Sequence, residues 1–247
     1  MSVLSLADID AAGSVGLAHD EVQIFLLTLD SSLLVDEHAL LSAGLIDQHE
    51  IARAVQYRNQ QARAQFIAGR SLARYALAQR TNVSPQRIAL KSDANGKPYA
   101  SDLAWHFNLT HSAHLIACAV ANSPVGIDVE HRQRHIEHLS RAQHYFSAAE
   151  YAWLCSKRQH DSSRFLALWT LKEAYLKALG IGISHGLAAM SWQISSAKLF
   201  RVDSPLSQQT WYCRLLQASP DYWLSLCCQE QITRVQIKRM SLKTLLQ

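Results

Sequence analysis

The chain has 247 residues, of which 49% are hydrophobic and 18% are charged, and it contains few Gly and Pro residues. This composition is that of a globular protein with ample apolar material for a core. The formal charge of +4 comes without the dense Lys/Arg blocks of a nucleic-acid binder, so we expect no nucleic-acid partner and a mild preference for acidic ones.

The N-terminal segment and the cysteines indicate a cytoplasmic protein. Met1–Gly13 has no basic start and carries Asp8 and Asp10 in its apolar stretch, which argues against a signal peptide. No apolar run approaches the ~20 residues that span a bilayer, so we expect no membrane partner. Five cysteines, an odd number without framework spacing, indicate reduced thiols, and we interpret all five as packing residues.

Strand-like and helix-like segments are mixed along the whole chain. Strand-like runs cover Gln23–Leu29, Leu115–Ala121, Val125–Val129, Trp211–Leu215 and Tyr222–Cys228. Helical patterns cover Leu33–Leu41, Gln48–Tyr57, Gln60–Arg80, Ile136–Tyr145, Ala148–Gln159 and Ser163–Leu179. Ser147-Ala148-Ala149-Glu150 fits a capping box, and Gly180 fits a helix end. The fold class predicted is therefore α+β or α/β.

Two of the predicted helices share a short sequence similarity. Phe66–Tyr75 and Phe165–Ala174, which lie 99 residues apart, have Phe, Ala and Leu at matching positions and Ser facing Thr. A duplication would explain this echo and would give two similar halves with a boundary near Asn122-Ser123-Pro124. We therefore predict two α/β subdomains, residues 1–121 and 122–247.

Two segments in the middle of the chain present candidates for phosphate binding. Asn95-Gly96-Lys97-Pro98 is a turn that presents Lys97, and Phe107–Ser112 carries His111 between two hydroxyl residues. These groups can receive a phosphate, although each segment alone also fits a plain exposed turn or strand end. His111-Ser112 gives little support for a serine hydrolase, because the chain has no Gly-x-Ser-x-Gly elbow.

The segment Gly126-Ile127-Asp128-Val129-Glu130 places two carboxylates together. Side chains alternate along a strand, so Asp128 and Glu130 point to one face and Ile127 and Val129 to the other. Two carboxylates that project together repel each other, and a hard divalent cation would relieve that repulsion. A strand with a solvated polar face is the structural alternative.

The helix predicted for Ser163–Leu179 has charged residues in and beside its apolar stripe. At about 100° per residue, one face carries Phe165, Leu168, Trp169, Tyr175, Leu176 and Leu179. Lys172 lies inside this stripe, where an unpaired ammonium is costly, so it must find an anion or extend past its neighbours. Glu173 and Lys177 lie at the edge of the stripe, where they fit an i,i+4 ion pair as well as a functional pair.

Together these segments resemble the Sfp-type 4′-phosphopantetheinyl transferase family. Gly126–Glu130 looks like the first signature of that family, Gly-Ile-Asp-(Val/Ile)-Glu. Trp169–Gly180 looks like the second, Trp-(Ser/Thr)-x-Lys-Glu-(Ala/Ser)-x-x-Lys-(Ala/Gly)-x-Gly. Tyr145–Glu150 is similar to the Phe-Phe-Ser-x-x-Glu that lies between the two signatures.

The coenzyme A segments of the family have counterparts as well. Gly96-Lys97-Pro98 matches Gly-Lys-Pro, and Phe107–Ser112 resembles Phe-Asn-(Ile/Leu)-Ser-His-Ser with Thr110 in place of the first Ser. The arginine-bearing helix of the family is matched only loosely, by Arg63-x-x-Phe66-x-x-x-Arg70. The resemblance runs from about Arg63 to Gly180, and the first fifty residues and the C-terminal quarter add little to it.

The resemblance implies two similar subdomains related by a pseudo-twofold axis, with the active site in the cleft between them. It implies that Asp128, Glu130 and Glu173 hold Mg²⁺ together with the pyrophosphate of coenzyme A. The activity implied is transfer of 4′-phosphopantetheine from coenzyme A to a serine of an apo acyl or peptidyl carrier protein, with release of adenosine 3′,5′-bisphosphate. A monomer is expected, because the duplication supplies internally what shorter holo-carrier-protein synthases achieve by trimerising.

The resemblance also implies roles for single residues. Glu173 is the candidate general base, directly or through a water, and Lys177 would neutralise the charge that develops on the leaving group or would protonate it. Lys97 and His111 would hold the adenosine 3′-phosphate. The full set of implied coenzyme A contacts is Lys97, His111, Ser112, Lys177, Arg63 and Arg70. Lys172 receives no role.

Three other interpretations stay open at this point. The same three carboxylates would suit a Mg²⁺-dependent phosphoesterase or nuclease. A carrier-protein-binding module with an inactive site is a second alternative, but the presence of all three carboxylates and of Lys177 argues against it. His131, His135 and His138 suggest a zinc site, but no Glu or Cys completes the ligand set, and the interleaved Arg132 and Arg134 favour a solvated basic segment. The pathway served, whether fatty acid, polyketide or nonribosomal peptide biosynthesis, is not indicated.

Overall fold

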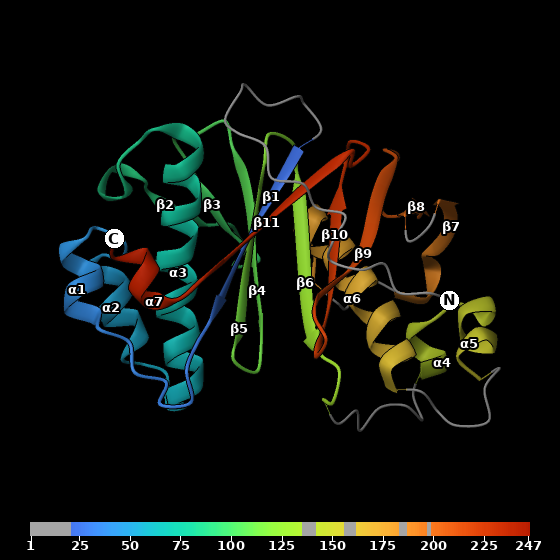
Figure 1. The fold of residues 1–247 in the computed structure, drawn as a ribbon. Coiled ribbons are helices and arrows are strands. Elements are labelled where there is room, and N and C mark those ends of the chain that lie inside the picture. Colours follow the sequence, from blue (N-terminus) through green and yellow to red (C-terminus); the bar gives the residue numbers. More distant parts are fainter. Residues whose placement is uncertain (1–20, 135–141, 156–161, 183–186, 197–198) are drawn as a thin grey trace.

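The computed structural model describes residues 21–134, 142–155, 162–182, 187–196 and 199–247. Two β-sheets pack face to face at the centre of the molecule, and helices cover the outer side of each sheet (Figure 1). Each half combines a sheet with one long helix, α3 (Gln60–Thr81) in the first half and α6 (Ser162–Leu179) in the second. The predicted α+β class is confirmed.

The described elements follow one another in this order. The first half contains β1 (Glu21–Thr28), α1 (Glu37–Ser42), α2 (Gln48–Ala54), α3, β2 (Leu90–Ser92), β3 (Pro98–Ala100), β4 (His106–Ser112) and β5 (Leu115–Ala121). The rest contains β6 (Val125–His131), α4 (Ala142–Tyr145), α5 (Ala148–Cys155), α6, β7 (Ser191–Ser196), β8 (Leu199–Asp203), β9 (Trp211–Ser219), β10 (Tyr222–Cys228), β11 (Arg234–Met240) and α7 (Leu242–Leu245).

Each predicted strand and helix corresponds to one of these elements. Two of the predicted helices extend over residues 136–141 and 156–159, which lie outside the described residues. The sequence patterns do not indicate β2, β3, β7, β8, β11 or α7, and they treat β4 only as a strand end. The predicted capping box is confirmed, because Ser147 N donates to Glu150 Oε2 (2.7 Å) and Glu150 N to Ser147 Oγ (3.4 Å).

Two sheets of different size form the centre of the fold. The first has the strand order β11-β1-β5-β4, and the second has the order β6-β10-β9-β8-β7. Neighbouring strands run antiparallel except β11, which lies parallel to β1 with Ile237 opposite Ile24. The short strands β2 and β3 form a separate hairpin. The edge strands β4 and β6 belong to different sheets.

The C-terminal strand joins the sheet of the first half. β11 pairs along β1, and Leu245 of α7 lies in the core beneath α3. This pairing places β11 beside the first half of the chain, because β1 would otherwise leave a row of unpaired backbone groups at the edge of a buried sheet. The division into subdomains 1–121 and 122–247 stays a prediction.

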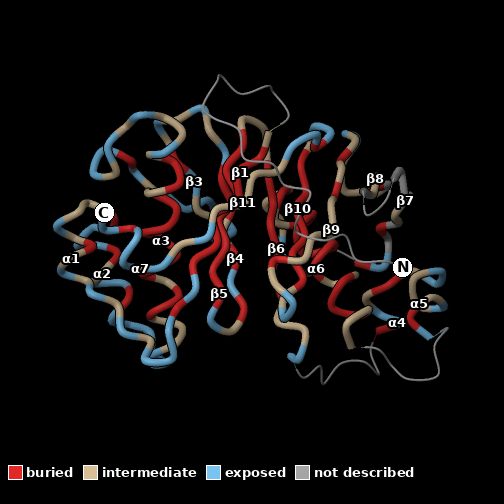
Figure 2. Tube along the Cα trace, viewed as in Figure 1, coloured by how far each residue is buried: buried red, intermediate tan, exposed pale blue. Residues whose placement is uncertain are grey.

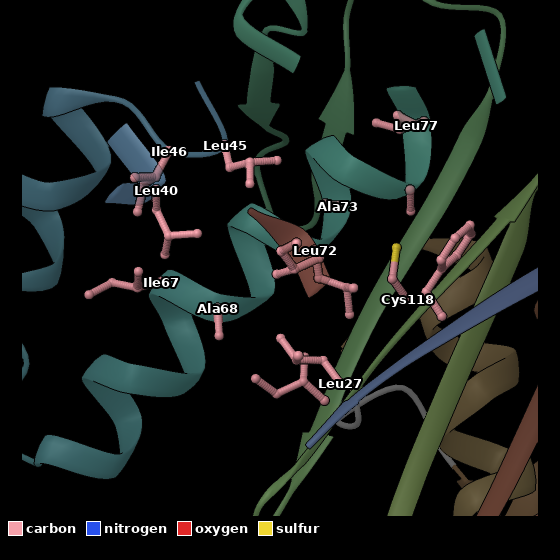
Figure 3. Packing of buried hydrophobic residues seen from close by; sticks show 14 of the residues in the cluster. Leu27, Leu40, Leu45, Ile46, Ile67, Ala68, Leu72, Ala73, Leu77 and Cys118 are labelled. Atoms are coloured by element: carbon pink, nitrogen blue, oxygen red, sulfur yellow. The ribbon is translucent and has the colours of Figure 1, made fainter. Parts of the chain in front are cut away.

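Three buried layers hold the helices and sheets together, and Figure 2 shows the buried residues concentrated along the central strands. Under α3, Leu72 packs with Leu27 and Cys118 of the first sheet (Figure 3). Between the sheets, Ile24 and Ile127 belong to one apolar cluster. Under α6, Tyr175 packs on the other face of the second sheet. The second sheet is thus covered on both faces.

The five cysteines form no disulfide. Cys118, Cys213, Cys227 and Cys228 are buried, as predicted, but Cys155 is exposed at the end of α5, so its interpretation as a packing residue is wrong. No helix in the described part of the chain is both long and apolar enough to cross a membrane.

Candidate active site

Two buried carboxylates project from β6 at the junction of the two sheets. Asp128 and Glu130 are only 5% and 6% exposed, so the alternative of a solvated polar strand face is wrong. Both side chains point away from the apolar cluster that holds Ile127 and Val129, as the strand alternation predicts. Carboxylates buried to this degree need hydrogen-bond donors or cations nearby.

The donors come from β4, which faces β6 across the junction. Three alternate side chains of β4 accept the outward N–H groups of β6: Asn108 from Ile127 (2.9 Å), Thr110 from Val129 (3.4 Å) and Ser112 from His131 (3.1 Å). Two of them also donate to the carboxylates, Thr110 Oγ1 to Asp128 Oδ1 (3.0 Å) and Ser112 Oγ to Glu130 Oε2 (2.7 Å). Side chains therefore join the two edge strands where backbone pairing does not.

Helix α6 lies directly on β6 because Gly126 has no side chain. A Cβ at this position would lie 2.0 Å from the carbonyl oxygen of Ala174 and 2.4 Å from the nitrogen of Ala178. These contacts are with helix backbone, which cannot move aside as a flexible side chain could. The glycine of the first signature thus brings the residues of the second signature, Glu173 and Lys177, up to the carboxylates of β6.

Lys177 pairs with the strand rather than with its own helix. Its Nζ donates to Asp128 Oδ1 (2.6 Å) and to Thr110 Oγ1 (3.0 Å). The helical spacing alone allowed an ion pair between Glu173 and Lys177. The observed partner lies on another element, and this contact joins α6, β6 and β4 at one point.

Glu173 completes the acidic set from the helix side. It is buried, and this burial, together with the charges of Asp128 and Glu130, raises the pKa of Glu173 to about 7 against the opposing effect of Lys177. Burial likewise raises the pKa of Glu130. The charge of Asp128 therefore lies close enough to Glu130 and Glu173 to disfavour the ionised forms of these two glutamates.

The chemistry of this set fits a hard cation. Asp128 Oδ2 and Glu173 Oε1 are buried and accept no hydrogen bond from the described residues. A divalent ion with oxygen ligands would satisfy both atoms and would offset the repulsion. The described residues nevertheless contain no three His, Cys, Asp or Glu side chains already arranged to hold a metal ion, so the carboxylates do not form a finished cage.

A pocket of about 410 Å³ opens beside Glu130. It is lined by His111, Ser112, Ala113, Glu130, His131 and Arg134. Arg134 also pairs with Glu130 through Nη1 and Oε1. Of the residues predicted to bind coenzyme A, the structure places His111 and Ser112 in this pocket, next to the acidic set.

Lys97 lies at the end of α6. Its Nζ donates to the carbonyl oxygens of Lys177 and Ala178, the second at 3.2 Å, and Asn95 Nδ2 donates to the carbonyl oxygen of Gly180 (2.7 Å). The β2–β3 hairpin thus caps the helix with a cation and an amide, which suits the negative end of a helix dipole. Burial lowers the pKa of Lys97.

Arg63 and Arg70 make their described contacts away from β6 and α6. Arg63 pairs with Glu37 of α1 (2.7 Å). Arg70 is buried, with Glu50 of α2 at 3.7 Å and Ser92 at 3.5 Å. The structure does not bring these two arginines together with the carboxylates, and their contact with coenzyme A stays a prediction.

The ammonium of Lys172 pairs with a carboxylate inside the protein, that of Glu150. The fully buried ammonium lies 2.9 Å from Glu150 Oε2 and donates to the carbonyl oxygen of Leu187 (2.6 Å), with the ring of Phe146 at 5.4 Å. Glu150 also caps α5, so Tyr145–Glu150 supplies a ring and a carboxylate that hold α6 in place. Sequence reasoning missed this partner, although a glutamate in a buried aromatic segment was a signal for it.

The histidines of the proposed zinc site are only partly described. His131 packs edge-on against Tyr222, with 4.8 Å between ring centroids. His135 and His138 lie outside the described residues.

Comparisons with known proteins agree with both halves of the site. The family model for the 4′-phosphopantetheinyl transferase superfamily matches residues 124–227, and the model for the N-terminal part of 4′-phosphopantetheinyl transferase matches residues 35–123. The first match contains β6 and α6, and the second contains β4 and the β2–β3 hairpin.

Three relatives illustrate the similarity. The 4′-phosphopantetheinyl transferase gsp of Aneurinibacillus migulanus is 37% identical over 60% of this chain, and the match spans 62% of that protein, less than two thirds. The 4′-phosphopantetheinyl transferase HetI of Nostoc sp. is 35% identical over 68% of this chain and 72% of its own length. A putative 4′-phosphopantetheinyl transferase of Synechocystis sp. is 30% identical over 87% of this chain and 90% of its own.

Proposed function

The chain belongs to the 4′-phosphopantetheinyl transferase superfamily, and on that premise we propose that it transfers the 4′-phosphopantetheine of coenzyme A to a serine of an apo acyl or peptidyl carrier protein, releasing adenosine 3′,5′-bisphosphate. The observation that carries this proposal is the meeting of Asp128 and Glu130 with Glu173 and Lys177 in one buried site. Such a site suits a reaction that moves a phosphoryl group between two oxygens.

Asp128, Glu130 and Glu173 are proposed to hold Mg²⁺. The two buried oxygens without partners and the raised pKa values of Glu130 and Glu173 support this assignment. When bound, the ion supplies charge that polarises a phosphoryl oxygen and orients the diphosphate.

Glu173 is proposed to accept the proton of the carrier serine, directly or through a water. Burial raises the pKa of Glu173 to about 7 in the free site, and Mg²⁺ on the same carboxylate would lower this pKa again and weaken Glu173 as a base. Lys177 is proposed to place its charge next to the leaving bisphosphate. Asp128 and Thr110 fix its ammonium in position, so that charge needs no reorganisation during the reaction.

Coenzyme A is proposed to lie across the junction of the sheets. His111 and Ser112 in the pocket beside Glu130 support contact with its phosphates. For Lys97 the proposal is contact with the 3′-phosphate, which requires Nζ to leave or share the carbonyls at the end of α6. Arg63 and Arg70 are proposed as more distant contacts.

The carrier partner is proposed to be acidic, which suits the formal charge of +4 and would raise the rate of encounter. We further propose a cytoplasmic monomer. Five cysteines without a disulfide support a reducing compartment, and two helix-and-sheet halves within one chain support a site complete in a single copy.

Intact-mass measurement of carrier proteins tests the function. The protein is incubated with coenzyme A, Mg²⁺ and a panel of apo acyl and peptidyl carrier proteins. We expect at least one carrier to gain the mass of one phosphopantetheine, and the gain to disappear with a chelator or with the carrier variant that lacks its serine. Consumption of coenzyme A or DNA by water, with every carrier unchanged, would instead indicate the phosphoesterase or nuclease alternative.

A further inference from the structure

Both carboxylates of β6 are held by a cation of the protein itself. Lys177 forms an ion pair with Asp128. Arg134, which follows Glu130 by four residues in the sequence, forms an ion pair with Glu130. The two partners in the second pair differ sharply in environment, because the side chain of Glu130 is 8% exposed and that of Arg134 is 57% exposed. A largely solvated guanidinium loses little when it leaves such a pair.

The pocket beside Glu130 gives Arg134 a second place to bind. Arg134, His111 and His131 all line it, so one wall of the acidic site is rich in side chains with N–H donors. Ser112 adds a hydroxyl at the same opening. A guanidinium fork next to imidazoles and a hydroxyl suits phosphate oxygens, which accept two parallel N–H bonds from one arginine.

Arg132, the neighbouring arginine on the same segment, is held in place by several contacts. Arg132 lies over the ring of Trp223 at 4.9 Å and donates to the carbonyl oxygen of Pro220 (3.0 Å) and to Ser163 Oγ (3.3 Å). Arg132 is not among the residues that line the pocket. Two arginines with the same charge, two positions apart, therefore have different tasks.

We propose that Arg134 exchanges partners during substrate binding. In the free protein Arg134 forms an ion pair with Glu130. When a divalent ion binds to Glu130, the guanidinium moves to a phosphate oxygen of the nucleotide in this pocket. The inference rests on the proposed function and adds a residue to it. Because Arg134 competes with the metal and assists the nucleotide, its removal must change the two affinities in opposite directions.

Calorimetric titration of the whole protein with Mn²⁺ alone, and then with coenzyme A at saturating Mn²⁺, tests the exchange. For Arg134→Gln we expect Mn²⁺ to bind about tenfold more tightly and coenzyme A about tenfold more weakly than in the wild type. Arg134→Lys keeps the charge without the fork, so Mn²⁺ affinity stays near the wild-type value while coenzyme A affinity still falls.

Arg132→Gln is the matched control, since it removes the same charge from the same segment. It is expected to change both affinities by less than about twofold. Thermal unfolding without ligand verifies that each variant is folded. If Arg134→Gln leaves either affinity unchanged while the wild type binds coenzyme A, the exchange is overturned and the proposed function stands. If the wild type itself fails to bind coenzyme A, both are overturned.

Discussion

At the residue scale, the missing side chain at position 126 sets the distance between β6 and α6. A methyl group there would overlap the backbone at Ala174 and Ala178, and helix and strand would have to separate. The distance from Glu173 and Lys177 to Asp128 depends on this contact. One small residue therefore controls the geometry of the acidic set without touching a substrate.

We predict that Gly126→Ala lowers the free energy of unfolding by about 1–3 kcal/mol and strongly reduces transfer to the carrier. Urea unfolding and the intact-mass assay measure the two effects. Gly69→Ala on α3 is the control, because a Cβ there meets Leu109 only at 3.9 Å and should be neutral or slightly stabilising. Full activity in Gly126→Ala would mean that the close contact is not needed.

The raised pKa of Glu173 predicts how the stability of the free protein changes with pH. Its pKa is raised by burial to about 7, so between its ordinary pKa and about 7 the folded state binds more protons than the unfolded state. The contribution of Glu173 to stability is therefore present below its ordinary pKa and is lost as the pH rises through that window.

The variant Glu173→Gln should remove this loss and abolish transfer. Urea unfolding between about pH 4 and pH 8 is expected to show the wild type losing stability relative to the variant as the pH rises. If the free energies of unfolding of the wild type and the variant change with pH in the same way over this range, the pKa of Glu173 is not raised in the folded protein. Near-normal turnover would remove it from the mechanism.

At the element scale, α6 is held at several points by other parts of the chain. Lys172 ties its middle to Glu150 of α5, and the β2–β3 hairpin caps its end through Lys97 and Asn95. The helix that carries Glu173 is thus fixed from both halves of the molecule. Lys97 has two candidate tasks, the helix cap and the proposed 3′-phosphate contact.

Lys97→Ala separates these two tasks. Because it would lose a charge next to the 3′-phosphate, we expect KM to rise more for coenzyme A than for 3′-dephospho-coenzyme A. Asn95→Ala removes only a cap hydrogen bond and should affect both substrates equally. If Lys97→Ala also changes both equally, the lysine serves only to cap the helix.

At the scale of the whole molecule, the first sheet is completed by the last strand of the chain. β11 covers the edge of β1, and Val235 and Ile237 pack against the apolar cluster between the sheets. That cluster includes Ile127 and Val129, the reverse side of the strand that carries the carboxylates. Folding of the site therefore depends on residues near the C-terminus.

A chain that ends at Thr233 is predicted to lose the cooperative unfolding transition of the full protein. It would expose the edge of β1 and part of the central cluster, and we expect aggregation as well as loss of transfer. Circular dichroism melting and light scattering report these effects. A chain that ends at Leu245 loses only two exposed residues and is the control. Normal melting of the shorter chain would show that β11 is dispensable.

Local sequence patterns were sufficient for much of the fold. The period of two placed Asp128 and Glu130 on one face of a strand, and the period of 3.6 placed Lys172, Glu173 and Lys177 on a helix. Both patterns depend only on backbone geometry within one element. The strand β2 has only three residues, too few for such a pattern, and β11 alternates only over Val235–Lys238. Neither strand contains a fully buried residue, so neither was predicted.

Partners between elements were decided only by the tertiary structure. The sequence determined by itself that Lys172 needs an anion and that Glu173 and Lys177 share an edge of their helix. It could not determine that Lys172 meets Glu150, that Lys177 meets Asp128, or that β11 returns to β1. The physical reason is that periodicity says which way a side chain points, whereas long-range packing decides what lies in that direction.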